Sequence, residues 1–322
     1  MERLYKFTYS LLVMAFLSIS FNSCIKEDLD NCSDIEYNPT DVLVYFDYLP
    51  ATYANIKEGI NPEEVTQMNL YWFDAETDFF LGEEIDDAVQ LSPDYFMTIA
   101  ALPAGKYRFI AWGNLSGNYS FKPESPIVGT TTFDRFATYL NTVEDDSVKN
   151  KIAPLFFAQS GVTEIKGGDI YTEIKMPIVQ NTYTINLTVK GRFNENSSYK
   201  YVITDDNTFY GFDNSFIPGG TVHYMTDCGS PKNGDINGSI TTLRIGRGRS
   251  PILKLIDAQD KNDPVFSIDL VQLILDLEKQ HKIEIDFSRM YEFNIEIKVE
   301  GDSFIITING WKLTYTEEEL HG

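Results

Sequence analysis

The sequence has few cysteines and few histidines, and both shortages exclude classes of site. Three cysteines among 322 residues cannot form the disulfide framework that holds many small secreted domains together. The three histidines, His223, His281 and His321, include no pair at the four-residue spacing of a zinc-binding helix. We therefore expect no metal ion and no cofactor in this protein.

Basic residues are also scarce. The chain has 26 lysines and arginines against 48 aspartates and glutamates, which gives a net charge of −22 at pH 7. A surface this acidic repels phosphate groups, both those of nucleic acids and those of anionic lipids. Nucleic acid is therefore excluded as a partner.

No apolar run near the N-terminus is long enough to cross a membrane. The run from Phe7 to Phe21 has about 15 residues, whereas a membrane-spanning helix needs about 20. It follows Arg3 and Lys6 and ends at small residues, which is the order of a secretory signal peptide. We expect residues 1–23 to be removed, which leaves 322 − 23 = 299 residues.

Cys24 stands directly after Asn22 and Ser23, where the signal should be cut, and this arrangement resembles a bacterial lipobox. The resemblance implies that the Cys24 thiol is acylated and becomes the mature N-terminus, with residues 24–38 as a lipid-anchored linker. The alternative is a plain signal peptide followed by an ordinary cysteine. Lys26-Glu27-Asp28 resembles the short signal that sends lipoproteins of Bacteroidota to the outer face of the outer membrane, so we expect a surface-exposed, lipid-anchored protein.

Acylation of Cys24 would leave Cys32 and Cys228 as the remaining cysteines. An oxidising compartment allows them to form a disulfide bond. Two separate thiols are an equally good interpretation, because the sequence does not show whether their Cα atoms lie within about 7 Å.

Aromatic residues make up 14% of the chain, led by 22 Phe and 19 Tyr, and this favours sheets over helices. In the first half, strands are predicted at 41–48, 68–74, 79–81, 95–102, 106–112, 155–159 and 170–176. Residues 113–154 are rich in Gly, Ser, Asn, Pro and Thr, and are interpreted as surface loops with a short helix at 133–140. Pro177 is interpreted as the end of the first domain.

The second half begins with a strand at 183–190, where apolar and polar residues alternate. Further strands are predicted at 199–204, 221–226, 239–245 and 252–256. A helix is predicted from Leu270 to His281, because Asp269 can cap its start and Leu270, Ile274 and Leu277 share one face. A hairpin follows, in which 291–300 and 304–308 are joined by Gly301-Asp302. This order predicts an all-β protein of two antiparallel β-sandwich domains, 39–178 and 179–322, with one notable helix in the second.

No pattern typical of catalysis was found. Asp257, Asp260, Asn262 and Asp263 are interpreted as a solvated loop, since the central Gly and closing Glu of a calcium loop are absent. Residues 246–249, Gly-Arg-Gly-Arg, lack the Lys-Ser/Thr of a phosphate loop and are interpreted as a turn with two exposed arginines. No Gly-x-Ser-x-Gly motif is present. We expect that the protein is not an enzyme.

Several motifs together resemble the fimbrial anchor lipoproteins of Bacteroidota, the FimB-like anchors. The motifs are Cys24 with Asp28-Leu29-Asp30 and Cys32, Leu70-Tyr71-Trp72-Phe73-Asp74, Leu102-Pro103-Ala104-Gly105-Lys106-Tyr107-Arg108-Phe109-Ile110-Ala111-Trp112-Gly113 and Ile308-Asn309-Gly310-Trp311. The similarity covers nearly the whole mature chain. It implies two tandem transthyretin-like sandwich domains, a place at the base of a fimbrium and no catalysis. The implied partners are fimbrillin (stalk) subunits and, through the acylated N-terminus, outer-membrane lipid.

The resemblance also implies how the subunits join. Stalk subunits of the family lose an N-terminal segment to an Arg- or Lys-specific protease, and a neighbour's strand fills the groove that opens. Here the first arginine of the mature chain is Arg108, and Lys26 is the one basic residue between Cys24 and Tyr48, so we expect the first strand to be retained. A donor strand would then come from the C-terminal segment, and its candidate residues are Phe304, Ile306, Ile308, Trp311, Leu313 and Tyr315.

A glycan-binding or adhesin module on the cell surface is the alternative function. Trp72, Trp112 and Trp311 could stack on sugar rings if they are exposed. All three lie inside predicted strands, which favours packing in the core instead.

Acylation of Cys24 can be tested directly. We expect a fatty-acid analogue supplied to growing cells to label the protein, and the substitution Cys24→Ala to abolish the label, because a lipobox presents this one thiol for modification. The measurement is in-gel detection of the analogue after purification. Label that persists in Cys24→Ala would refute the lipobox interpretation.

Overall fold

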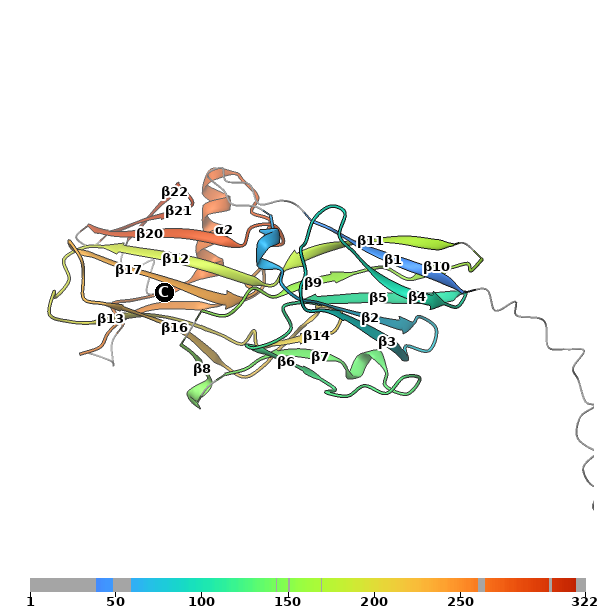
Figure 1. Cartoon of the computed structure of the whole chain (residues 1–322). Helices are drawn as coiled ribbons and strands as arrows, with labels where there is room; N and C mark the ends of the chain where they lie inside the picture. The colour runs from blue at the N-terminus through green and yellow to red at the C-terminus, as the bar shows by residue number, and fades with distance from the viewer. Residues whose placement is uncertain are drawn as a thin grey trace, which may run out of the picture. The chain divides into compact units, whose positions relative to one another are not determined.

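The computed structural model describes residues 39–48, 59–142, 144–149, 151–168, 170–259, 264–300 and 303–316 (Figure 1). The chain divides into two compact units, Met1–Pro39 and Thr40–Gly322. Cys24 and Cys32 belong to the first unit and lie outside the described residues. The fold below is that of the second unit.

The first half of this unit is built from strands. They are β1 (Thr40–Asp47), β2 (Met68–Asp74), β3 (Phe80–Asp86), β4 (Phe96–Leu102), β5 (Gly105–Gly113), β6 (Tyr119–Lys122), β7 (Ala137–Leu140), β8 (Ser147–Val148), β9 (Phe156–Gln159), β10 (Thr163–Ile165) and β11 (Tyr171–Gln180). The main sheet has the order β3-β2-β5-β9-β11-β1-β4, with β10 also paired to β5. In β1 the alternate residues Val42, Val44 and Phe46 are buried, as expected for a strand with one face on the core.

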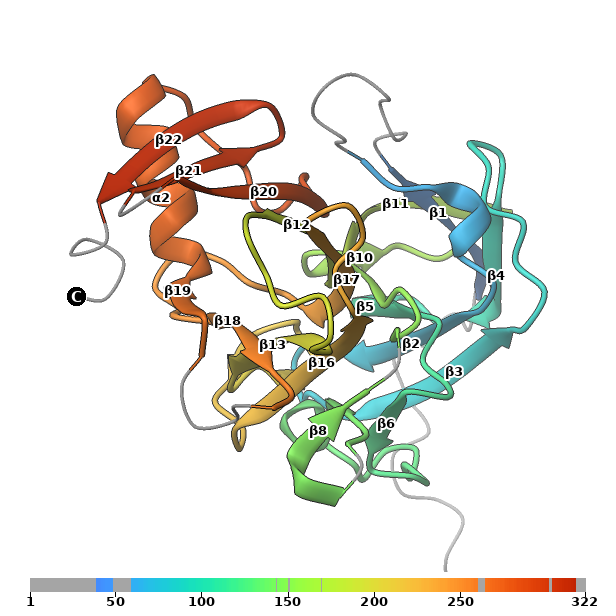
Figure 2. The same ribbon diagram turned by 90° about the vertical axis from the view of Figure 1, so that its left-hand side faces the viewer.

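The second half contains the remaining strands and the helix α2 (Leu270–His281). The strands are β12 (Thr182–Lys190), β13 (Tyr199–Asp205), β14 (Phe209–Gly211), β15 (Phe216–Ile217), β16 (Val222–Gly229), β17 (Asp235–Leu243), β18 (Ile252–Asp257), β19 (Phe266–Asp269), β20 (Glu292–Glu300), β21 (Ser303–Ile308) and β22 (Trp311–Thr316). One sheet has the order β17-β12-β20-β21-β22 and another β19-β18-β13-β16-β8. Helix α2 lies beside β22 in both ribbon views (Figures 1 and 2).

The all-β fold class with a notable helix in the second half is confirmed. Helix α2 has the predicted bounds, and the Asp269 side chain accepts the Gln272 N–H at 2.9 Å as the predicted cap. Leu270, Ile274 and Leu277 are buried on its inner face. The helix is therefore stabilised in two ways: its apolar stripe packs against a sheet, and the Asp269 carboxylate accepts one of the N–H groups left free at its N-terminus.

The sheets are mixed, so the purely antiparallel arrangement that we predicted is wrong at three pairings. β1 runs parallel to β11, β12 runs parallel to β20, and β8 runs parallel to β16. The partners in the first two pairs are separated by more than 90 residues of chain. Local alternation of apolar and polar residues does not carry information about pairing at that separation.

The interpretation of residues 113–154 as surface loops is also wrong. β6 and β7 join β14 and β15 in a four-stranded sheet, and the predicted helix is a single 3-10 turn, Phe133–Arg135, followed by β7. Phe136 and Leu140 are buried. The polar composition of this segment concealed strands whose pairing partner, β14, lies about 70 residues later in the chain.

Pro177 does not end its strand, because β11 continues to Gln180. Asp47 and Pro177 are the last pair in the ladder with β1, and β11 pairs with β9 from Ile178 onward. Pro177, which has no N–H to donate, therefore lies where the ladder with β1 ends and directly before the ladder with β9 begins. Only Asn181 separates β11 from β12, and the division into domains at 178/179 stays a prediction.

Phe212, from the second half, lies in an aromatic cluster of the first half. Its ring centroid is 4.7 Å from that of Phe136 and 5.0 Å from that of Tyr71. The other rings around it are Phe73, Trp112, Phe121 and Phe133. Phe212 is 1% exposed, so this ring joins the cores of the two halves.

Removal of the Phe212 ring should therefore destabilise the whole unit. We expect Phe212→Ala to lower the free energy of unfolding by about 3–5 kcal/mol, because it leaves a cavity among rings that cannot collapse onto it. Phe96 is 44% exposed, and Phe96→Ala is the matched control, expected to cost less than about 1 kcal/mol. Denaturant unfolding measures both, and equal losses would contradict the central place of Phe212.

Candidate functional site

The predicted donor residues form the last two strands of the protein's own sheet. β21 pairs with β20 on one side and with β22 on the other. Among the candidates, Phe304, Ile306, Ile308 and Leu313 are buried, and Trp311 is half-buried against the ring of His281. For Tyr315 only the backbone is described. The structure thus brings these residues together, and whether any of them enters a partner's sheet stays a prediction.

The turn between β21 and β22 sets which backbone groups face outward. Asn309 and Gly310 both have positive φ, 48° and 87°, as a two-residue turn of type I′ requires. In such a hairpin Ile308 and Trp311 exchange hydrogen bonds, so the next residue, Lys312, and then Thr314 and Thr316 direct their N–H and C=O groups away from β21. Because β22 is the last strand of its sheet, these groups form an edge.

Part of this edge is already covered by α2. Gln280 Nε2 donates to the Lys312 carbonyl oxygen at 3.1 Å, and His281 Nε2 donates to the same oxygen at 2.8 Å. A carbonyl oxygen only accepts, so the Nε2 atom of His281 carries the proton. Beyond Lys312 the same edge of β22 continues with the backbone of Thr314 and Thr316.

The first strand, in contrast, lies inside its sheet. β1 pairs with β11 from Asp41 to Asp47 and with β4 on its other side. Val42 and Val44 are fully buried. Removing β1 would break two ladders and open the core.

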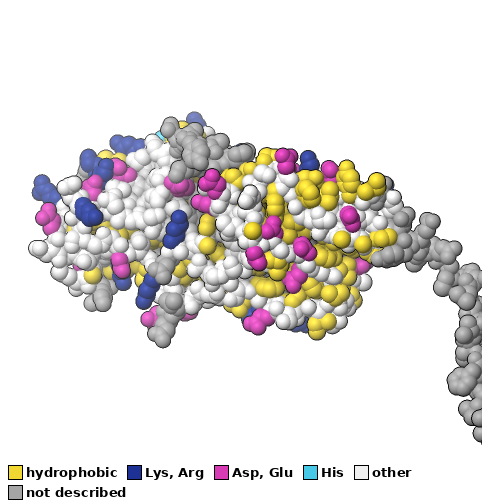
Figure 3. All heavy atoms as spheres, viewed as in Figure 1, with side chains coloured by type: hydrophobic (Ala, Val, Ile, Leu, Met, Phe, Trp, Pro, Cys, Tyr) yellow, Lys and Arg dark blue, Asp and Glu magenta, His cyan; other side chains and the backbone are white. Residues whose placement is uncertain are grey.

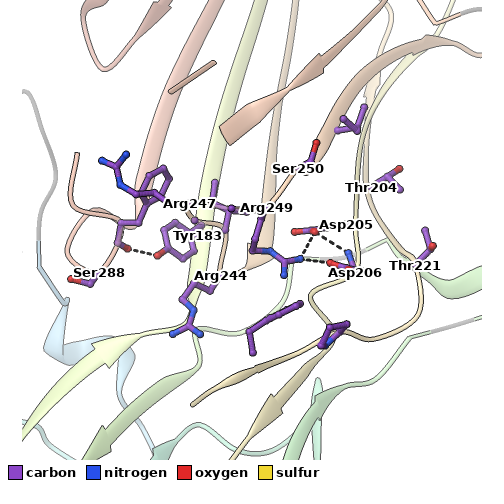
Figure 4. Close-up of a pocket in the computed structure, with 17 residues that line it drawn as sticks. Tyr183, Thr204, Asp205, Asp206, Thr221, Arg244, Arg247, Arg249, Ser250 and Ser288 are labelled. Carbon is purple, nitrogen blue, oxygen red and sulfur yellow. Dashed lines mark hydrogen bonds and ion pairs between the residues drawn. The ribbon is translucent and has the colours of Figure 1, made fainter. Parts of the chain in front are cut away.

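A cleft of about 890 Å³ lies between the loop of residues 244–250 and β13, β15 and β18 (Figure 4). The loop includes the Gly-Arg-Gly-Arg turn, and the interpretation of two exposed arginines is wrong for Arg249, whose side chain is only 14% exposed. Its guanidinium lies 3.7 Å from the centroid of Phe216 and forms ion pairs with Asp205 and Asp206. Burial raises the pKa of Asp205, and the charge of Arg249 opposes that shift.

The other two arginines of the loop contact different neighbours. Arg247 forms a 2.6 Å ion pair with Glu278 of α2, and Arg244 donates to the Asn214 carbonyl oxygen at 2.9 Å. Figure 4 shows Arg247 pointing away from the Arg249 pair rather than toward a common point. The three guanidinium groups therefore hold the loop against three parts of the fold and do not converge on one ligand.

The described residues show no arrangement typical of a catalytic or metal centre. His223 shares a hydrogen bond with Thr204, 3.0 Å between Nδ1 and Oγ1, and His281 binds the backbone of β22. Within the described ranges no three His, Cys, Asp or Glu side chains gather as metal ligands.

The tryptophans give little support to sugar stacking. Trp112 is fully buried, and Trp72 packs across Gly82, where an added Cβ would lie 2.3 Å from its ring. Trp311 is half-buried. Of the three tryptophans, Trp112 is therefore inaccessible to a sugar ring.

Cys228 is half-buried, and burial raises the pKa of its thiol to about 11. A thiol held protonated in this way reacts slowly. Because Cys32 lies outside the described residues, the pairing of Cys32 with Cys228 stays a prediction.

Sequence reasoning missed Phe212 and the Asp205–Arg249 pair. Phe212 lies in a short segment between β14 and β15 that has no apolar periodicity. Asp205 ends β13 and meets Arg249 from 44 residues later, a contact that no local pattern indicates. The sequence feature that pointed to the Asp205–Arg249 region was the cluster of arginines at 244–249.

Comparisons with known proteins agree with this architecture. The fimbrial anchor protein Mfa2 from Porphyromonas gingivalis matches with a TM-score of 0.68 and 23% identity, over 85% of this chain and 98% of that one. A Bacteroides thetaiotaomicron protein proposed to bind polysaccharide matches with a TM-score of 0.68 and 19% identity, over 87% and 99%. A proposed adhesin from Bacteroides ovatus matches with a TM-score of 0.66 and 19% identity, over 86% and 95%. At these identities the likeness shows the fold.

No curated protein matches the sequence. The family model of the fimbrillin-A associated anchor proteins Mfa1 and Mfa2, however, matches residues 29–317, which is most of the chain. This protein therefore belongs to the family of fimbrillin-A associated anchor proteins.

Proposed function

We propose that this protein anchors a fimbrium to the outer membrane and ends its assembly by binding one fimbrial subunit through a β-strand. The observation that carries the proposal is the contrast between the two ends of the fold. β1 lies between two strands and is unavailable to a donor, whereas β22 presents an edge at Thr314 and Thr316. A subunit that joins a polymer at one place only can terminate it.

Strand addition at an edge supplies main-chain hydrogen bonds and fixes register, which suits a permanent joint. The edge of β22 is short, and Lys312 lies within it. Short edges and charged residues discourage pairing between copies of one protein. We infer that β22 is kept for a partner of different sequence.

The membrane attachment is proposed to be the acyl group on Cys24. Among the described residues, no helix has the length and apolar content that crossing a membrane requires. Two or more acyl chains give stable attachment, because each buried CH₂ contributes about 0.8 kcal/mol. The role is structural, and no catalytic step is part of the proposal.

The mature protein should keep β1. N-terminal mapping of protein purified from cells is expected to give Cys24 as the first residue, because no arginine of the mature chain precedes Arg108 and a cut after Lys26 would release the lipid. Mass spectrometry of the N-terminal peptide makes the measurement. A stable product that begins beyond Tyr48 would show that the first strand is removed and that this protein accepts a donor strand.

The anchor role is tested by deletion and complementation. Cells without the protein should assemble fimbriae but release them into the medium, and the wild-type gene should restore attachment. Thr314→Pro removes one outward N–H of β22 without removing a hydrogen bond to β21, so it should fail to restore attachment although the protein reaches the surface.

Thr314→Val is the matched control, because it retains the backbone N–H, and it should restore attachment. Electron microscopy and the ratio of cell-bound to released fimbrillin measure the outcome. If the deletion strain keeps fimbriae of normal length on the cell, the anchor function is wrong. If Thr314→Pro restores attachment as well as Thr314→Val, the role of the β22 edge is wrong and the anchor function stands.

A further inference from the structure

Exposed apolar residues gather where the chain enters the fold at β1. Ile170, directly before β11, is 90% exposed, and Tyr171, the first residue of β11, is 52% exposed. Ala101 near the end of β4, and Pro103 and Ala104 in the connection from β4 to β5, are exposed as well. We name these five residues the N-terminal rim.

The two segments of the rim meet at the start of β1. Thr40 pairs with Leu102, and Asp41 pairs with Tyr171. The Asp41 side chain also accepts the Ala101 N–H at 2.9 Å. The rim therefore surrounds the point at which residue 39 leads into the fold, and Figure 3 shows hydrophobic side chains spread over this half of the unit.

Exposed apolar patches on a soluble domain mark contact with another protein or with a membrane. Tyrosine is enriched at the interface between lipid and water, because its ring is apolar and its hydroxyl remains hydrated. Lys166, four residues before Ile170, is exposed and can extend its ammonium group past such an interface. The composition of the rim suits a lipid surface.

The short stretch of sequence between Cys24 and the fold also favours a lipid surface as the partner of the rim. Cys24 and Pro39 are 39 − 24 = 15 residues apart, and a chain of that length spans at most about 50 Å. Once Cys24 is held in a membrane, the rim stays within that distance of the lipid. A tethered contact is effectively intramolecular, so even a weakly binding surface is occupied much of the time.

A second copy of the protein is a poorer occupant. It would bring a second net charge of −22 against an already acidic molecule. A neutral lipid surface carries no such repulsion.

We propose that the N-terminal rim rests on the outer-membrane lipid surface and orients the anchored protein. The inference depends on the proposed acylation of Cys24. The contact adds little to the attachment that the acyl chains supply. Its consequence is orientation, since β22 belongs to the other half of the unit and is thereby directed away from the membrane (Figure 1).

The test places one fluorophore on the full-length acylated protein. Cys32→Ser and Cys228→Ser remove the other thiols, and Ile170→Cys introduces a single labelling site in the rim. Ile85→Cys is the matched control, because Ile85 is 46% exposed and pairs with Asn69, beside Trp112. Trp112 is seven residues along β5 from Gly105, roughly 23 Å from the rim end of that strand.

Each labelled protein is reconstituted into phosphatidylcholine vesicles with brominated acyl chains, and flotation is measured first. We expect both to float, and the label at position 170 to be quenched about twofold, since interfacial side chains lie about 5–10 Å into the headgroup region. The label at position 85 should be unaffected. Unfolding midpoints close to that of the wild type exclude misfolding of either variant.

The outcomes separate the two proposals. Protein that fails to float refutes the acyl anchor and this inference with it. Protein that floats without quenching at position 170 refutes the rim contact and leaves the anchor intact. Equal quenching at both positions, or a dimer by sedimentation with no quenching, would equally overturn the proposed orientation.

Discussion

The burial of Phe212 in the aromatic cluster of the first half is the contact on which the rest of the architecture depends. β7 and β14 pair in one sheet, so strands from the two halves share hydrogen bonds next to this ring. A joint with both a shared ladder and a shared core resists bending between the halves. For a protein proposed to link a membrane to a fibre, this joint would transmit a pulling force from one half to the other.

The two halves repeat one arrangement of strands, and the repeat explains where the open edge lies. β1 lies between antiparallel β4 and parallel β11, as β12 lies between antiparallel β17 and parallel β20. Beyond β11 the first half continues with β9, β5 and β2, whereas beyond β20 the second half continues with β21 and β22 and ends. β22 thus corresponds to β5, and among the described residues no strand pairs with β22 as β2 pairs with β5. A partner strand at that edge would run antiparallel to β22, as β2 does to β5.

Local elements could be predicted from the sequence wherever periodicity was regular. Tyr183, Ile185, Leu187 and Val189 alternate with polar residues, and β12 follows that alternation. Helix α2 was predicted with its cap, because Asp269 and the spacing of Leu270, Ile274 and Leu277 are local signals. The contacts of Phe212 and Arg249 could not be predicted, because each depends on segments that come together only in the folded protein. The polar residues around β6 and β7 concealed strands for the same reason.

The edge of β22 combines two properties that appear opposed, stability in the free protein and availability to a partner. Gln280 and His281 satisfy the outward carbonyl of Lys312, so the end of the edge near the turn is hydrogen-bonded without a partner. The outward groups of Thr314 and Thr316 lie farther along the same edge, and they are the proposed place for a partner strand. A partner that pairs there first would reach Lys312 last and would have to displace two side chains from one oxygen. Non-specific pairing at this edge is then disfavoured, because a short strand forms few hydrogen bonds before it meets α2. A strand of the right length and sequence can extend along the whole edge.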